Sequence, residues 1–226
     1  MRRRWFGLSV AILTVGGLFV ASGCGGGSQA KLRVVNASPN ETGIDVLIDG
    51  KSVATGIAYG SNSDYLTVDA GSRHIQVQAT STTNILLDQN LSFNSDTETT
   101  YLATNFAASI SAMVLSDDRT APTSGNVNLR VVNAALSMGP VDVYIVTPGA
   151  DLIASTPVIR SLAFDAATDY QTLTAGNYEV VVTLPNSTFA LVDTGALNLA
   201  SGQNRTMLAL NGVSGGFTAT LLSDLN

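Results

Sequence analysis

Lys31–Asp49 reads KLRVVNASPNETGIDVLID, and Asn128–Val146 reads NLRVVNAALSMGPVDVYIV. The two stretches align without a gap. The similarity continues to the end of both copies in these matching segments: Asp64-Tyr65 and Asp169-Tyr170, Ala70-Gly71 and Ala175-Gly176, Leu115-Ser116-Asp117 and Leu222-Ser223-Asp224. A repeat of about 100 residues is too long for a solenoid unit and fits a self-contained domain. The chain is therefore predicted to contain two tandem copies of one domain.

Apolar residues recur at every second position along both copies, which predicts β-strands. The alternating apolar positions of the first copy are Leu32 and Val34, then Ile44, Val46 and Ile48, then Ile75 and Val77. A two-residue period is typical of strands that are buried on one face only. We therefore expect these residues to face the core and their neighbours to face solvent.

Asp49-Gly50 lies between two such runs and indicates a tight hairpin, because glycine tolerates the positive φ that the turn requires. The second copy has a longer turn, Thr147–Ala150, at this place. No segment after the first 24 residues shows helical periodicity. These features predict an all-β chain of two tandem antiparallel, immunoglobulin-like β-sandwiches, with a small β-barrel as the alternative fold.

The linker between the copies contains Pro122 and Gly125, which interrupt the alternation on both sides. The predicted organisation is a signal peptide at residues 1–23, a modified Cys24 with a glycine-rich tether at residues 24–30, a first β-sandwich at residues 31–118, a linker at residues 119–127 and a second β-sandwich at residues 128–226.

The first 24 residues have the three parts of an export signal. Three arginines follow Met1, an apolar run extends from Trp5 to Val20, and the small residues Ala21-Ser22-Gly23 precede Cys24. This end resembles the lipobox of bacterial lipoproteins, although Ala21 stands where leucine is commonest. The resemblance implies cleavage before Cys24 and lipidation of its thiol. Plain secretion and an uncleaved membrane anchor are the alternatives, and for an anchor the apolar run is short against the ~20 residues that span a bilayer.

Acyl chains such as palmitate on Cys24 would hold the protein on a membrane, since each buried methylene contributes about 0.8 kcal/mol. Gly25–Ala30 would form a flexible tether between the lipid and the first domain. Gly25 stands where inner-membrane lipoproteins of two-membrane bacteria carry aspartate, so the leader resembles those sorted to the outer membrane. The expected location is the cell envelope, at the outer membrane or cell surface.

The chain of 226 residues has 11 Lys and Arg against 17 Asp and Glu, a formal net charge of −6, and loss of the leader removes three of the basic residues. Nucleic-acid affinity comes mainly from basic side chains that release counterions, so nucleic-acid binding is not expected. The single cysteine excludes an intramolecular disulfide.

LRVVNASP, IDVLIDG and DYLTVDAGSRHIQV in the first copy, with LRVVNAA, VDVYIV and DYQTLTAGNYEVVV in the second, resemble the exported bacterial domain-of-unknown-function family DUF4397. The resemblance covers nearly all of residues 31–226. It implies a cell-envelope β-domain, often in tandem, and supplies no catalytic residues.

Gly212–Gly216 matches the G-x-S-x-G pattern of hydrolase nucleophiles, which requires a strand-to-helix turn and a later histidine. His74 is the chain's only histidine and lies earlier, and a strand-like segment follows Gly216, so a glycine-rich hairpin turn is predicted instead. His74 shares the polar face of its strand with Gln76 and is expected at the surface. With one histidine and one cysteine, no zinc site, catalytic residue or cofactor is predicted.

Aspartates at strand ends are the remaining candidates for a functional site, either as calcium ligands or as the paired carboxylates of a glycosidase. They are Asp45, Asp49, Asp64, Asp69, Asp117, Asp118, Asp142 and Asp169. No EF-hand-like spacing connects them, so turn formation and surface charge are the preferred interpretation and no metal is predicted. Tyr65 and Tyr170 are equivalent in the two copies and are expected to be core or corner residues whose hydroxyls bond nearby backbone.

These observations favour a non-enzymatic, lipid-anchored cell-envelope protein that acts as a spacer or interaction module. Its expected partners are the membrane, through lipid on Cys24, and envelope proteins or glycans. The alternative is a surface lipoprotein that binds a small ligand or carbohydrate in its loops or in the groove between the copies. A hydrolase would require a cluster of titratable groups that the sequence does not show. The oligomeric state is left open.

Overall fold

A computed structural model describes residues 27–225, and this part of the chain is built almost entirely of β-strands. The first copy contains β1 (Gln29–Asn36), β2 (Gly43–Ile48), β3 (Lys51–Ala58), β4 (Leu66–Asp69), β5 (Gly71–Ala79), β6 (Ile85–Phe93), β7 (Glu98–Thr104), the 3-10 turn η1 (Ala107–Ser109) and β8 (Ser111–Asp117). The second contains β9 (Asn126–Asn133), η2 (Leu136–Met138), β10 (Val141–Val146), η3 (Leu152–Ala154), β11 (Ile159–Leu162), β12 (Ala166–Ala167), β13 (Gln171–Thr174), β14 (Gly176–Thr183), β15 (Ala190–Leu199), β16 (Asn204–Asn211) and β17 (Phe217–Leu225). Within residues 27–225 no helix is long and apolar enough to cross a membrane.

Each copy folds into two four- or five-stranded sheets packed face to face. In the first copy one sheet has the order β4-β1-β7-β8 and the other β3-β2-β5-β6. In the second copy the corresponding sheets have the orders β12-β9-β16-β17 and β11-β10-β14-β15. Strand β13 also pairs with β9. The sheets are antiparallel except for one parallel pair in each copy, β1 with β7 and β9 with β16. The predicted all-β pair of sandwiches is confirmed.

The turns form where the sequence places them. Asp49 and Gly50 both have positive φ, 50° and 75°, and join β2 to β3 with Ile48 opposite Lys51, as expected for a type I′ hairpin. In the second copy the Ala150 amide donates to the Thr147 carbonyl over 3.1 Å, which closes the longer turn there. The linker region lies between the end of β8 and the start of β9.

Each sandwich has its own apolar core between its two sheets. The first core includes Leu32, Val34, Ile44, Val46, Ile75 and Val77, as the alternation predicted. The second is built around the equivalent strands, from residues such as Leu129, Val131, Val143, Val180 and Met207.

Strand β1 departs from the expectation of one buried face, because Arg33 and Val35, which point away from the core, are also buried. The same holds for β9, where Arg130 and Val132 are buried opposite Leu129 and Val131. These outer faces are covered by the other sandwich. Successive residues are therefore buried on both sides of the strand, a pattern usual for the inner sheets of layered proteins.

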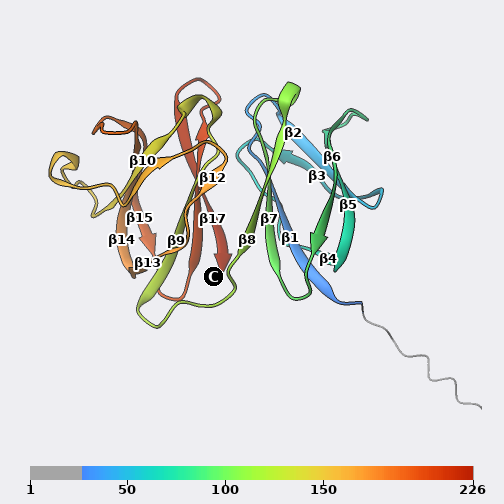
Figure 1. Ribbon diagram of the computed structural model, residues 1–226, viewed down its shortest axis with the longest axis horizontal. Helices are drawn as coiled ribbons and strands as arrows, with labels where there is room; N and C mark the ends of the chain where they lie inside the picture. Colours follow the sequence, from blue (N-terminus) through green and yellow to red (C-terminus); the bar gives the residue numbers. More distant parts are fainter. Residues whose placement is uncertain (1–26, 226) are drawn as a thin grey trace, which may run out of the picture.

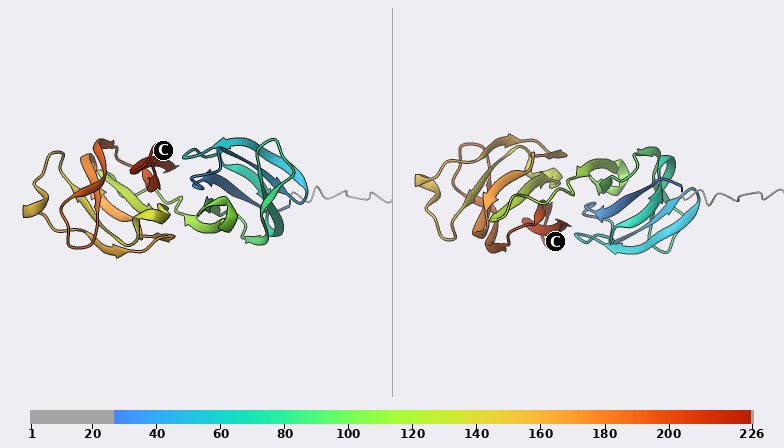
Figure 2. Two further views of the ribbon diagram at one scale, coloured as in Figure 1. Left: turned by 90° about the horizontal axis from the view of Figure 1, so that it is seen from above. Right: turned by 90° about the horizontal axis from the view of Figure 1, so that it is seen from below.

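The two sandwiches pack side by side, so that the sheets form four layers with the β1 and β9 sheets in the middle (Figure 1). Views from above and below show the same side-by-side arrangement (Figure 2). A third apolar cluster fills this interface. It consists of Val35, Ala37, Leu102 and Leu115 from the first copy and Val132, Ala134, Leu208, Leu210 and Leu222 from the second.

Truncation of Leu208 should weaken both sandwiches together. Leu208→Ala removes a fully buried side chain from the interface cluster, and such truncations cost about 2–5 kcal/mol. We expect the urea midpoint of the chain to fall, measured by circular dichroism. Val213→Ala, at a side chain that is 84% exposed, is the control and should leave the midpoint unchanged. Equal midpoints for the two variants would contradict the interface described here.

Candidate functional site

Two arginines lie in the middle of otherwise apolar strands and point into the interface between the sandwiches. Arg33 of β1 and Arg130 of β9 occupy the same position of the repeated LRVVN segment. Both are almost fully buried, at 2% and 4% exposure. A buried guanidinium requires a counter-charge and hydrogen-bond acceptors, and the structure supplies both from the opposite copy.

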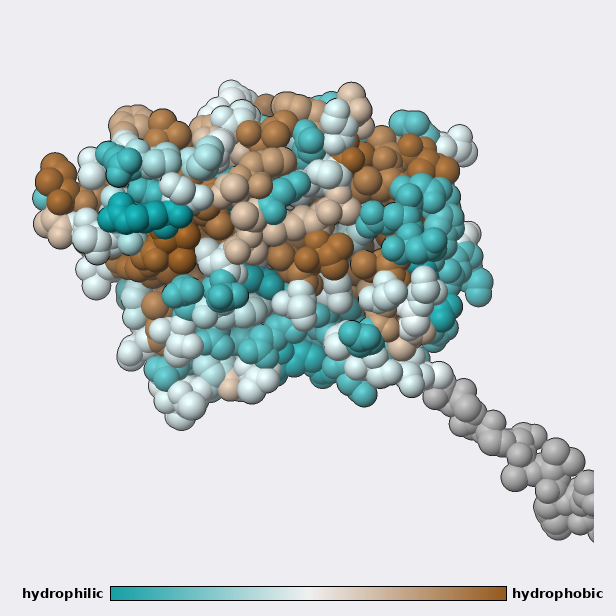
Figure 3. Space-filling view, viewed as in Figure 1, coloured by the Kyte–Doolittle hydropathy of each residue, from teal (hydrophilic) through white to brown (hydrophobic). Residues whose placement is uncertain are grey.

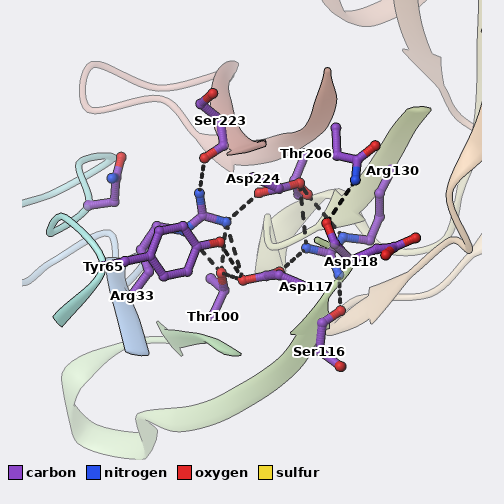
Figure 4. A network of polar contacts seen from close by, with 12 residues as sticks. Arg33, Tyr65, Thr100, Ser116, Asp117, Asp118, Arg130, Thr206, Ser223 and Asp224 are labelled. Atoms are coloured by element: carbon purple, nitrogen blue, oxygen red, sulfur yellow. Dashed lines mark hydrogen bonds and ion pairs between the residues drawn. The ribbon is translucent and has the colours of Figure 1, made fainter. Parts of the chain in front are cut away.

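The arginines form reciprocal ion pairs across the interface (Figure 4). Arg33 Nη2 lies 2.5 Å from Asp224 Oδ1 at the end of β17, and Arg130 Nη2 lies 2.5 Å from Asp117 Oδ1 at the end of β8. Each arginine also approaches the aspartate of its own copy, Arg33 to Asp117 at 3.7 Å and Arg130 to Asp224 at 3.9 Å. Two positive and two negative side chains thus alternate in one buried cluster.

Neighbouring backbone and hydroxyl groups complete the cluster with the same symmetry. Arg33 Nη1 donates to the Ser223 carbonyl over 2.9 Å, and Arg130 Nη1 donates to the Ser116 carbonyl over 3.0 Å. In the first copy the Thr100 hydroxyl accepts from Arg33 Nε and donates to Asp117. Thr206 does the same between Arg130 and Asp224. The polar side chains are therefore well satisfied, as a buried ionic group requires.

Tyr65 and Tyr170 cover the two ends of the cluster. The Arg33 guanidinium lies 4.8 Å from the centre of the Tyr65 ring, and the Arg130 guanidinium lies 4.6 Å from that of Tyr170, as in cation–π contacts. The Tyr65 hydroxyl donates to Asp117 over 2.7 Å, and the Tyr170 hydroxyl donates to Asp224 over 2.8 Å. Both were expected to be core or corner residues whose hydroxyls bond nearby backbone; the partner of each hydroxyl is instead a carboxylate.

Within the cluster, the surroundings favour the charged form of Arg33 and the neutral forms of Tyr65 and Tyr170. Burial lowers the pKa of the Arg33 guanidinium. The charge of Asp224, with smaller contributions from Tyr65 and Asp117, raises it by more, so the pKa lies above its usual value. Burial, and then the nearby charge of Asp117, raises the pKa of Tyr65. Burial and Asp224 do the same to the pKa of Tyr170. These groups are held in fixed protonation states, so the cluster is suited to joining the domains and poorly suited to proton transfer.

Two of the other aspartates considered as calcium ligands, Asp45 and Asp142, are bonded within the protein itself. Asp45 accepts from the Gly56 amide over 2.7 Å and from the Thr80 hydroxyl, and these bonds lower its pKa. Asp142 accepts from the Ser161 amide over 2.8 Å. Across residues 27–225, no group of three His, Cys, Asp or Glu side chains is placed to hold a metal ion. Asp117 does not serve as the surface charge that the sequence suggested, because it lies in the buried cluster.

His74 and the Gly212–Gly216 segment behave as predicted. His74 is exposed on β5, and its Nε2 lies 2.6 Å from Asp88 Oδ1 on the neighbouring β6. Gly212–Gly216 is the turn between β16 and β17, closed by a hydrogen bond from the Gly212 amide to the Gly216 carbonyl over 2.8 Å. Strand, not helix, follows the serine, so the nucleophile geometry is not formed. Cys24 lies outside residues 27–225, and its lipidation stays a prediction.

Arg33 and Arg130, together with the threonines that bind them, were not identified from the sequence. The available signal was a charged residue at the same place inside both apolar LRVV runs, matched by an aspartate at the same place near both C-terminal ends. Alternation identifies which residues share a face but not which distant strand covers it. The pairing of Arg33 with Asp224, 191 positions apart, therefore required the structure.

The family described as "Domain of unknown function (DUF4397)" matches residues 30–144 and 146–226. The chain belongs to this family. The match confirms the resemblance drawn from the repeated segments, with two copies, although the two matched ranges meet inside β10 whereas the sandwiches separate between β8 and β9. No match among curated proteins was found.

Two solved structures show weak similarity. CBMbc, a family CBM26 module from Eubacterium rectale Amy13K in complex with maltoheptaose, is 15% identical with a TM-score of 0.27, over 87% of this chain and 98% of that one. A leucine-rich repeat protein from Bacteroides thetaiotaomicron is 16% identical with a TM-score of 0.19, and the alignment spans 79% of this chain but only 25% of that protein. At these TM-scores neither likeness bears on the ligand or partner of this chain.

Removal of one aspartate from the cluster should be strongly destabilising. Asp224→Ala leaves the Arg33 guanidinium buried without its closest counter-charge, and breaking a buried pair in this way costs about 3–5 kcal/mol. The free energy of unfolding from urea titration measures the loss. The double variant Arg33→Met/Asp224→Leu removes both charges and should recover most of it. Arg119→Met, which breaks an exposed pair with Glu98, is the control; a loss for Asp224→Ala no larger than this control would refute the assignment.

Alkaline pH should destabilise the interface through the half-buried Tyr59. Burial raises the pKa of Tyr59 to about 12, whereas tyrosine in an unfolded chain titrates near pH ~10. Folding therefore favours the neutral phenol, and this stability is fully present below about pH 10 and is lost as the pH rises to about 12. Tyr59→Phe should flatten the decline in unfolding free energy across this range. Tyr178→Phe, whose hydroxyl bonds Thr174 at the surface, is the control, and identical pH profiles for the two variants would contradict the prediction.

Proposed function

We propose that this chain is a non-catalytic, lipid-anchored protein of the cell envelope whose two β-sandwiches act as one rigid body. The observation that carries the proposal is the reciprocal Arg33–Asp224 and Arg130–Asp117 cluster, embedded in the apolar interface between the copies. A linker alone would let two domains move independently. Buried ion pairs with fixed geometry hold them in one relative orientation.

A non-catalytic role follows from how the titratable groups are used. The buried acids and bases neutralise one another across the interface, and the partly exposed His74 pairs with Asp88 of the neighbouring strand. Ser214, the nucleophile candidate, lies in a strand-to-strand turn, and the chain's only histidine, His74, lies on β5 of the first copy, so these two residues do not form a nucleophile–base pair.

The lipid anchor is supported by the sequence before residue 27, and the arrangement of the strands indicates which end of the protein an anchor would leave free. The start of β1 and the linker after β8 lie at the same end of the two sandwiches, the lower end in Figure 1, and the β16–β17 turn lies at the opposite end. Hydrophobic residues gather in the upper half of the face shown in Figure 3, and the lower half is mainly hydrophilic. A tether from Cys24 would thus present the upper end to other envelope components, which we propose as its protein or glycan partners.

Replacement of the lipidated residue tests the anchor. Cys24→Ser removes the thiol, so the variant should leave the membrane fraction of the native host, because no acyl chain can be attached. Ser28→Ala, in the tether, is the matched control and should stay with the membranes. Mass spectrometry of the mature N-terminal peptide should show an acylated Cys24, and protease treatment of intact cells reports surface exposure. Unchanged membrane partitioning of Cys24→Ser would rule out the anchor.

A further inference from the structure

The approximate two-fold symmetry of the interface is broken at several equivalent positions, among them Gly60 and Asp165. Gly60 follows Tyr59 at the end of β3, as Asp165 follows Phe164 in the second copy, and both have positive φ, 73° and 55°. The Asp165 carboxylate crosses the interface and accepts from the hydroxyls of Thr104 at 3.0 Å and Ser111 at 3.2 Å. At Gly60 no side chain is available to make the corresponding contact.

A cavity of about 420 Å³ lies where Gly60 faces the second copy. Its walls come from both sandwiches and are joined directly. The Tyr59 hydroxyl donates to the Asn211 carbonyl over 2.7 Å, and the Thr220 hydroxyl donates to the Gly60 carbonyl over 3.1 Å. The cavity is thus part of the fixed interface, and its volume lies within the ~300–1,000 Å³ usual for small-molecule sites.

The residues that line this cavity combine aromatic rings with hydroxyl groups and include no charged side chain. Tyr59 and Phe217 contribute the rings, and Ser214, Thr218 and Thr220 contribute hydroxyls. Neither the Ser214 nor the Thr218 hydroxyl bonds to another group within residues 27–225, so both are free to bind a ligand. Rings pack against the apolar faces of sugar-like molecules, and hydroxyls exchange hydrogen bonds with their edges.

We propose that this interdomain cavity binds an uncharged, hydroxyl-bearing ring ligand of about one or two sugar units. A charged ligand would lose its hydration without finding a counter-charge among the lining residues. The cavity is bordered by the turn between β16 and β17, at the end of the molecule opposite the start of β1 (Figure 1). This binding role goes beyond the anchored rigid body proposed above and does not depend on the lipid.

The second copy supplies the variant that closes the cavity. Gly60→Asp introduces the residue found at the equivalent Asp165, where aspartate already tolerates positive φ. A Cβ at Gly60 would meet Leu210 and Thr220 at ordinary contact distances of 3.7 and 3.8 Å, so the backbone can accept it. Gly125→Asp, at an exposed glycine of similar φ with nothing within 4 Å of an added Cβ, is the matched control.

Saturation-transfer NMR on Gly25–Asn226, which contains all three apolar cores, tests the proposal in solution. The probes are N-acetylglucosamine and cellobiose at millimolar concentration, with glucuronate and glucosamine as charged comparators. We expect signals from the uncharged sugars with the native chain and with Gly125→Asp, and their loss with Gly60→Asp. Thr218→Val, which keeps the shape and removes one hydroxyl, should weaken binding about tenfold.

Three results would overturn the proposal: no signal from either uncharged sugar with the native chain, an undiminished signal with Gly60→Asp, or equal binding of the charged sugars. Thermal melting of each variant establishes that it is folded. If Gly60→Asp does not fold, Thr218→Val decides alone, since unchanged affinity in that variant overturns the site. Because the assay uses chain without Cys24, its outcome is separate from that of the membrane-anchoring experiment.

Discussion

A charge removed from water must meet an opposite charge, and the arrangement of the two sandwiches satisfies this requirement. Each copy brings one arginine and one aspartate to the outer face of its inner sheet. The closest partner of each arginine is the aspartate of the other copy, at 2.5 Å, while the aspartate of its own copy is more than 1 Å farther away. Only a two-fold-like placement of the copies makes both short pairs at once. The repeated arginine and aspartate positions therefore determine how the two copies pack against each other.

The apolar cluster and the ionic cluster have different roles at this interface. Burial of Leu102, Leu208 and Leu210 supplies the favourable free energy, since removal of apolar surface from water drives association. That force has no direction, and two flat sheets could pack at several angles and offsets. The ion pairs contribute less net stability, because desolvation offsets much of their attraction. Any other packing would leave these charges buried and unpaired, which is costly. The ion pairs therefore fix the orientation of the two sandwiches.

Much of each sandwich could be predicted from local pattern, and little of the interface could. The Asp49-Gly50 turn and the inward-facing Ile75 and Val77 depend on neighbours in sequence, and the structure places them as expected. Arg33 was missed because period-two alternation assigns it to the face away from the core and gives no information on what covers that face. Tyr65 was expected to be a core or corner residue, but its carboxylate partner, Asp117, follows from the position of β8, which sequence pattern does not define.

Duplication also explains where the two copies are free to differ. A change at Arg33 or Asp117 would disturb both ion pairs, because the four charged groups share one cluster. Positions at the edge of the interface carry no such coupling. Asp165 forms its own bonds to the first copy, whereas Gly60 leaves space that the symmetric contact would have filled. Loss of one side chain at an uncoupled position can therefore open a cavity while the central cluster keeps both walls in place, which is how a structural interface can gain a binding site.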